Sequence, residues 1–149
     1  MKRDIHLEWF LAFPRQEVWT CLTDPELIGR WLMKNDFQPV VGHRFQFRDK
    51  AKKGFGWDGI VYCQVLEVIP EEKLSFRWQG GPGDGTLTLD SVVTWTLVAQ
   101  PGGTRLVLDH TGFKGFKGLI ASMVMKKGWA HHVIRRFTEI LTERTHAHV

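Results

Sequence analysis

The chain has 149 residues, of which 43% are hydrophobic and 24% charged. This composition is typical of an ordinary globular protein and argues against a disordered one, and the length predicts one domain over residues 1–149. The formal charge is only +4, with basic and acidic residues mixed along the chain, which argues against a nucleic acid as partner.

The aromatic content is unusual. Ten Phe and seven Trp residues stand beside a single Tyr. Such a chain carries many bulky apolar groups, together with indole N–H donors that need hydrogen-bond partners when they are buried. The composition leaves open whether these rings fill a core or line a pocket.

The cysteines and the hydropathy of the chain indicate the cellular compartment that we expect for the protein. Cys21 and Cys63 do not lie in a CxxC or a Cys/His ligand spacing, so we expect two reduced, buried thiols. No hydrophobic signal core follows the basic first residues, and no apolar run reaches the ~20 residues of a membrane helix. We therefore expect a cytoplasmic protein with no membrane partner.

The first third of the chain predicts one strand and two short helices. Apolar residues occupy the odd positions from Ile5 to Leu11, which is the period of a half-buried strand. Pro14 suits the first position of a helix that ends near Thr23. A stronger start signal follows at once, because Asp24 is a good N-cap and the next residue is a proline.

The middle of the chain predicts an antiparallel sheet. Alternating apolar and polar residues indicate strands at 44–48, 74–79, 87–97 and 105–110. Between the first two of these, the run 57–68 is apolar at both even and odd positions and indicates a longer strand with a partly covered outer face. No helix separates them, so neighbours along the chain should pair in antiparallel fashion with one face buried. From about Lys117 to Arg144, apolar residues recur at three- and four-residue steps and predict one long amphipathic helix.

Side-chain parity assigns the rings to one interior. The inward strand positions are Trp9, Phe45, Phe47, Phe76, Trp78 and Trp95, and the helix is expected to add Met123, Trp129, Val133 and Phe137. A stripe of this kind is more often core than ligand pocket, because close packing is the normal state of apolar faces.

A set of short motifs, in order along nearly the whole chain, resembles the SRPBCC (START-like) superfamily, in the branch similar to the C-terminal domain of the activator of heat-shock-protein-90 ATPase. The motifs are FPRQEVW from Phe13, LTDPE from Leu22, Trp31, VGHRF from Val41, GIV from Gly59, EVIP from Glu67, KL from Lys73, GTRL from Gly103, HTGF from His110 and GW from Gly128.

The resemblance implies an α+β, helix-grip (START-like) fold. A curved antiparallel sheet of about six or seven strands wraps around a long C-terminal helix, and two short helices follow the first strand. It also implies a hydrophobic cavity between sheet and helix. If the interior is hollow, the predicted ligand-binding residues are Phe45, Phe47, Phe76, Trp78, Trp95, His110, Met123, Trp129 and Val133.

His110 is the best polar candidate for a site. It shares strand parity with Leu106 and Leu108 and should therefore point inward. One interpretation is a neutral core histidine bonded to a backbone carbonyl. The other is a group that orients a ligand or acts as general acid or base, which makes His110 the single catalytic candidate.

Gly128 also invites two interpretations, because glycine inside a helix costs ~1 kcal/mol relative to alanine. It either permits a kink or a close approach to the sheet, or it opens space beside Trp129. We predict no metal site, since adjacent His131 and His132 point in different directions on a helix. No nucleotide-binding motif or nucleophile elbow occurs, so no cofactor is predicted.

Three functions follow from the sequence. The leading hypothesis is the binding of a small hydrophobic molecule, aromatic or lipid-like, in the interior. The second is an enzyme resembling polyketide cyclases or aromatases, with His110 as acid or base. The third is an interaction module, which forms either a homodimer or a complex with a chaperone. The chaperone is implied by the resemblance only. We do not expect the extra N-terminal domain of the eukaryotic activators in this chain.

Overall fold

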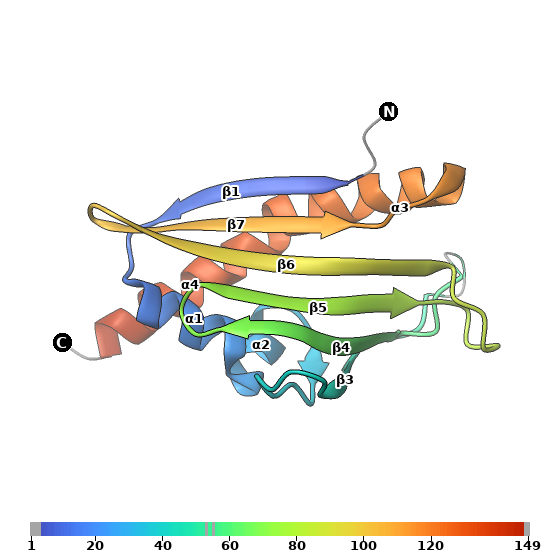
Figure 1. Cartoon of the computed structure of the whole chain (residues 1–149), viewed down its shortest axis with the longest axis horizontal. Coiled ribbons are helices and arrows are strands. Elements are labelled where there is room, and N and C mark those ends of the chain that lie inside the picture. The colour runs from blue at the N-terminus through green and yellow to red at the C-terminus, as the bar shows by residue number, and fades with distance from the viewer. Residues whose placement is uncertain (1–3, 53, 55, 148–149) are drawn as a thin grey trace.

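The computed structural model describes residues 4–52, 54 and 56–147. A seven-stranded antiparallel sheet carries one long, interrupted helix on its concave face (Figure 1). The strands are β1 (Ile5–Leu11), β2 (Lys34–Asn35), β3 (Arg44–Arg48), β4 (Ile60–Ile69), β5 (Lys73–Gly80), β6 (Leu89–Gln100) and β7 (Gly103–Thr111). The helices are α1 (Arg15–Thr23), α2 (Pro25–Trp31), α3 (Gly115–Lys127), the π-helical turn η2 (Gly128–Val133) and α4 (Ile134–Ala147).

The strand order is β1-β7-β6-β5-β4-β3-β2, so β1 joins the sheet beside the last strand. Ile5 lies opposite His110, and Leu11 lies opposite Thr104. The helix-grip architecture expected from the sequence is confirmed. The short strand β2, at the far edge of the sheet, is an addition that the sequence analysis did not predict.

The two short helices form where their start signals predict them. The carboxylate of Asp24 accepts hydrogen bonds from the backbone N–H groups of Glu26 at 2.9 Å and Leu27 at 3.4 Å, so it caps α2 as expected. α2 presents Trp31 to the core, where the indole N–H donates to the carbonyl of Cys21 at 2.8 Å. The Trp31 ring lies edge-on to Trp95 and Phe137, which fixes α2 between the sheet and α4.

The C-terminal helix differs from the single regular helix that the sequence predicts. The chain widens into the π-helical turn η2 at Gly128 and returns to an α-helix at Ile134. A Cβ on Gly128 would meet no atom within 4 Å, so the predicted close approach to the sheet is wrong there. The helical path bends through η2, as Figure 1 shows, and α3 extends beyond the ends of β1 and β7.

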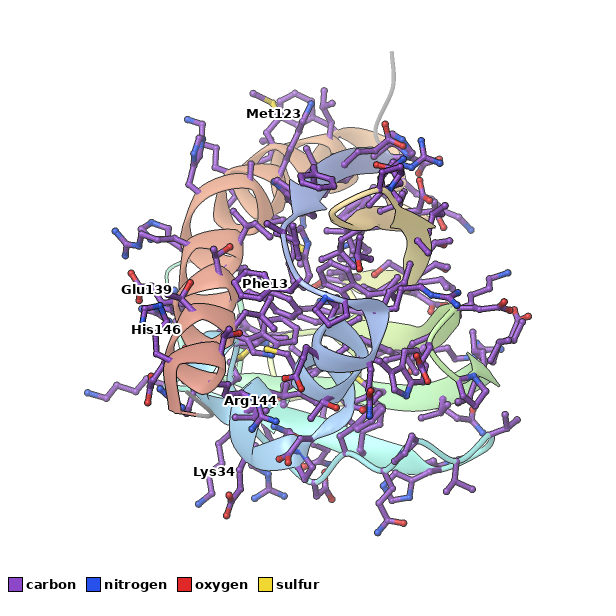
Figure 2. The ribbon with its side chains drawn as sticks, turned by 90° about the vertical axis from the view of Figure 1, so that its left-hand side faces the viewer. Phe13, Lys34, Met123, Glu139, Arg144 and His146 are labelled. Carbon is purple, nitrogen blue, oxygen red and sulfur yellow. The ribbon has the colours of Figure 1, made fainter. Side chains whose placement is uncertain are left out.

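The inward orientation that the sequence predicts for Met123 on α3 is also wrong. Ile120, Met123 and Val124 are 47%, 60% and 58% exposed, and Met123 points away from the sheet in Figure 2. The side of α3 that faces the core instead holds buried Gly118 and Ser122. In the part of the chain that the structure describes, no helix is long and apolar enough to cross a membrane.

Candidate functional site

The concave face of the sheet carries a continuous wall of aromatic rings. Phe45, Phe47, Phe76, Trp78 and Trp95 are each at most 5% exposed, as the parity of their strands predicts. Phe47 lies 5.4 Å from Trp78 between ring centroids, and Trp78 in turn lies 5.5 Å from Trp129 on η2. The sheet and the helix therefore meet through aromatic contacts at the middle of the interior.

His110 lies at the polar centre of this wall. Its side chain is fully buried, and its ring lies 4.7 Å from Phe113 and 5.6 Å from Trp78 between centroids. The chain leaves β7 through Gly112, whose left-handed φ of +103° favours glycine. This turn places Phe113 over the imidazole.

Both imidazole nitrogens have partners. The indole Nε1 of Trp129 donates to Nδ1 of His110 at 3.2 Å, and Nε2 lies 2.8 Å from the hydroxyl oxygen of Ser91. An indole only donates, so Nδ1 must be the acceptor and the single proton of the neutral ring sits on Nε2. The hydroxyl of Ser91 then accepts from Nε2 and donates to the carbonyl of Trp78 at 2.8 Å.

We call this series of hydrogen bonds from Trp129 through His110 and Ser91 to the Trp78 carbonyl the His110 relay. Burial lowers the pKa of His110 to about 3, because the charged imidazolium would lose its hydration. The relay is therefore neutral near pH 7. Of the two interpretations of His110, the neutral core histidine fits, although its partners are a hydroxyl and an indole rather than a backbone carbonyl.

The structure brings most, but not all, of the predicted site residues together. Seven of them, the five sheet aromatics with His110 and Trp129, lie together in the interior. Val133 is half-buried against the core, whereas the exposed Met123 lies outside it. Ser91 and Phe113 belong to the cluster but were not predicted, although Ser91 shares the inward parity of Val93 and Trp95 on β6.

The remaining buried polar side chains carry hydroxyl groups. Among the described residues, the buried polar ones are Ser75, Ser91, Thr104, His110 and Ser122. The described residues also contain no cluster of three or more His, Cys, Asp or Glu that could hold a metal ion. The described residues form a hollow open to solvent along α4 between Ile134 and His146 and another beside Phe13, and neither is lined by residues of the aromatic wall.

Comparison with known proteins gives a family and a set of similar structures. The model of a family described as Activator of Hsp90 ATPase homolog 1-like protein matches residues 12–142. No curated protein matches the chain. The crystal structure of protein MLL2253 from Mesorhizobium loti shares 37% identity at a TM-score of 0.82, over 95% of this chain and 98% of that one.

Two more distant structures share the fold. DynU16, a protein of the dynemicin biosynthetic locus, is 23% identical with a TM-score of 0.73, over 95% of this chain and 48% of that one. The Aha1 dimer from Colwellia psychrerythraea is 16% identical with a TM-score of 0.69, over 89% of this chain and 91% of that one.

Proposed function

We propose that this protein, which belongs to the family of Activator of Hsp90 ATPase homolog 1-like proteins, binds a small apolar ligand, aromatic or lipid-like, between the sheet and the C-terminal helix. The START-like fold supports ligand binding or a cyclase-like role in general. The observation that carries the specific proposal is the wall of rings from Phe47 through Trp78 to Trp129. Binding sites for small molecules are mostly apolar and aromatic with few polar groups, as this interior is.

The His110 relay favours an apolar ligand over a polar one. Each polar atom of the relay already has a partner within the protein. A polar ligand would lose its hydration without gaining new strong hydrogen bonds, which costs roughly 1–3 kcal/mol for each group. A flat hydrocarbon or aromatic molecule has no polar group whose hydration would be lost, and it would stack on the rings.

The ligand would enter at the π-helical turn η2, where the C-terminal helix is least regular. The rings are in mutual contact, so a ligand must displace part of the wall, and Trp129 lies on the π-helical turn η2. No neighbour lies within 4 Å of a Cβ on Gly128, so this turn has free space at its first residue. We therefore place entry at η2 and the adjoining end of α3.

The state of His110 supports binding over catalysis. A general acid or base acts best when its pKa lies near the working pH, and burial holds the pKa of His110 at about 3. The other buried polar side chains among the described residues are Ser and Thr hydroxyls, which are poor general acids and bases near pH 7, so they do not favour a cyclase-like mechanism over binding. An association with a chaperone is supported by the family description alone.

The test begins with native mass spectrometry of protein purified without refolding, which should show a co-purified small molecule. In parallel, the uncharged fluorescent probe N-phenyl-1-naphthylamine should bind with one-to-one stoichiometry and receive excitation energy from Trp129 and Trp78. Absence of both a bound molecule and stoichiometric probe binding would refute the proposal.

Two substitutions locate the site. Ser91→Leu adds bulk to the inward side of β6 and should abolish probe binding. Thr94→Leu, at a half-buried position on the opposite face of the same strand, should leave it unchanged. If Ser91→Leu fails to fold, Trp129→Phe provides the second measurement, because it removes one of the two energy donors, keeps an aromatic ring in place and should weaken energy transfer to the probe.

A further inference from the structure

One face of α3 presents an exposed apolar stripe, which we define as Phe116, Ile120, Met123 and Val124. Their exposed fractions are 75%, 47%, 60% and 58%. Single exposed apolar residues are normal on protein surfaces, but a contiguous group usually marks an interaction site. Of these four residues, Met123 was predicted to face the interior, and its exposure leaves the apolar side of α3 without a partner among the described residues.

The spacing of the stripe follows the helix. Successive residues turn by about 100°, so positions 116, 120, 123 and 124 fall within an arc of about 100°. Gly118 and Ser122, which are buried toward the protein, lie on the opposite side. The stripe therefore points straight away from the sheet, in agreement with the outward direction of Met123 in Figure 2.

The charged residues of α3 and of the chain segments directly before and after it are all basic. Residues 110–138 contain six Lys or Arg and no Asp or Glu, which exceeds the net charge of +4 of the whole chain. On the helical wheel Lys117 and Lys126 flank the stripe on its two sides, and Lys127 lies at its C-terminal end. All three lysines are exposed.

We propose that α3 docks on the surface of an anionic lipid bilayer, with the apolar stripe in the boundary between headgroups and acyl chains. An apolar helical face bordered by lysines is the pattern of helices that lie in a membrane interface. The lysine stems lie along the apolar layer while their ammonium groups reach the lipid phosphates. This revises the expectation of no membrane partner, which considered only membrane-spanning segments and signal sequences and not a helix that lies on the surface of a bilayer.

The stripe and its flanking lysines fit two other partners, a second copy of the chain and a nucleic acid, less well. A second copy of the chain, packed stripe against stripe about a two-fold axis, would bring the flanking lysines of both copies together. A nucleic acid would use the lysines but would leave the four apolar side chains without a role. The inference does not depend on the proposed ligand site, because it uses the outer face of α3 alone.

The test is co-sedimentation of the intact protein with vesicles. The protein should bind vesicles of phosphatidylcholine that contain phosphatidylglycerol, and should bind much less to phosphatidylcholine alone. The variant Phe116→Ser with Met123→Ser should reduce partitioning by roughly tenfold or more. The variant Lys126→Gln with Lys127→Gln should reduce it about fivefold for each lysine, and added salt should act in the same direction.

Matched controls use exposed residues elsewhere. Phe10→Ser removes a ring that is 55% exposed on β1, and Lys50→Gln with Lys52→Gln removes two exposed charges in the loop after β3. Both controls should bind vesicles like the unmodified chain. Since the stripe lies outside the core, the variant Phe116→Ser with Met123→Ser should keep the melting temperature of the unmodified chain. It should also bind the probe in the interior as the unmodified chain does.

Three results would overturn the proposal. The first is equal binding to anionic and neutral vesicles or to neither. The second is a dimer, seen by light scattering, that dissociates when Phe116 and Met123 become serine while vesicles bind nothing. The third is salt-dependent binding to duplex DNA without binding to vesicles.

Discussion

The indole N–H of Trp129, on the helical turn η2, donates a hydrogen bond of 3.2 Å to Nδ1 of His110, on strand β7. This bond joins the helix to the sheet inside an otherwise apolar interior. It also fixes the tautomer of His110, because the proton of the neutral ring must then lie on Nε2 and point to Ser91.

A double-mutant cycle can measure how much the hydrogen bond between Trp129 and His110 contributes to the free energy of unfolding. Trp129→Phe keeps a ring in place but leaves the buried Nδ1 without a donor, which should cost about 1–3 kcal/mol in the free energy of unfolding. His110→Leu removes the acceptor. Urea unfolding of the two single variants and the double variant should give a coupling of about 0.5–3 kcal/mol, and strictly additive effects would contradict the assignment.

The stability of the protein should depend on pH through His110. Its pKa is about 3 in the folded chain and 6.5 when the group is free, so between these values the unfolded chain binds a proton that the folded chain does not. Stability should therefore fall as the pH falls from about 6.5 toward about 3, with a slope of up to about 1.4 kcal/mol per pH unit.

Urea unfolding between pH 6.5 and 5 checks this slope before carboxylates begin to contribute. The control is His110→Gln, which cannot take up a proton and should give a flatter profile. Equal slopes for the two proteins would contradict the buried neutral state of His110.

A second histidine should titrate in the opposite direction. His6 on β1 lies opposite Asp109 on β7, and its Nδ1 is 2.6 Å from the carboxylate, which raises the pKa of His6 above 6.5. Its favourable contribution is complete below pH 6.5 and is lost as the pH rises through the raised pKa. An NMR titration should show this upward shift, and Asp109→Asn should remove most of it.

The two cysteines should be unreactive in the folded protein. Both thiols are free and buried, and burial raises the pKa of Cys21 to about 12 and that of Cys63 further. The reactive thiolate is therefore scarce at pH 8. Ellman's reagent should modify both thiols after unfolding in urea and neither within minutes before it; rapid reaction of the native protein would contradict this burial.

Several features of the fold and of the candidate site could be predicted because they depend on local rules. Side chains alternate across a strand, so the apolar parity of β3 and β5 was enough to direct Phe45, Phe47 and Trp78 inward. The cap at Asp24 depends only on the next few residues, and it forms as predicted. The inward direction of His110 follows from the same parity on β7.

The sequence by itself therefore determined the order of the elements, the antiparallel sheet and the aromatic character of its inner face. The tertiary structure decided the partners of His110, because Ser91 and Trp129 come from elements whose separation in space no local period describes. It also decided which side of α3 faces the core. That helix carries apolar residues on two sides, so its periodicity fits either orientation. In the structure Ala121 and Met125 pack against the core, whereas Phe116, Ile120, Met123 and Val124 stay in solvent, because α3 extends beyond the ends of β1 and β7 (Figure 1).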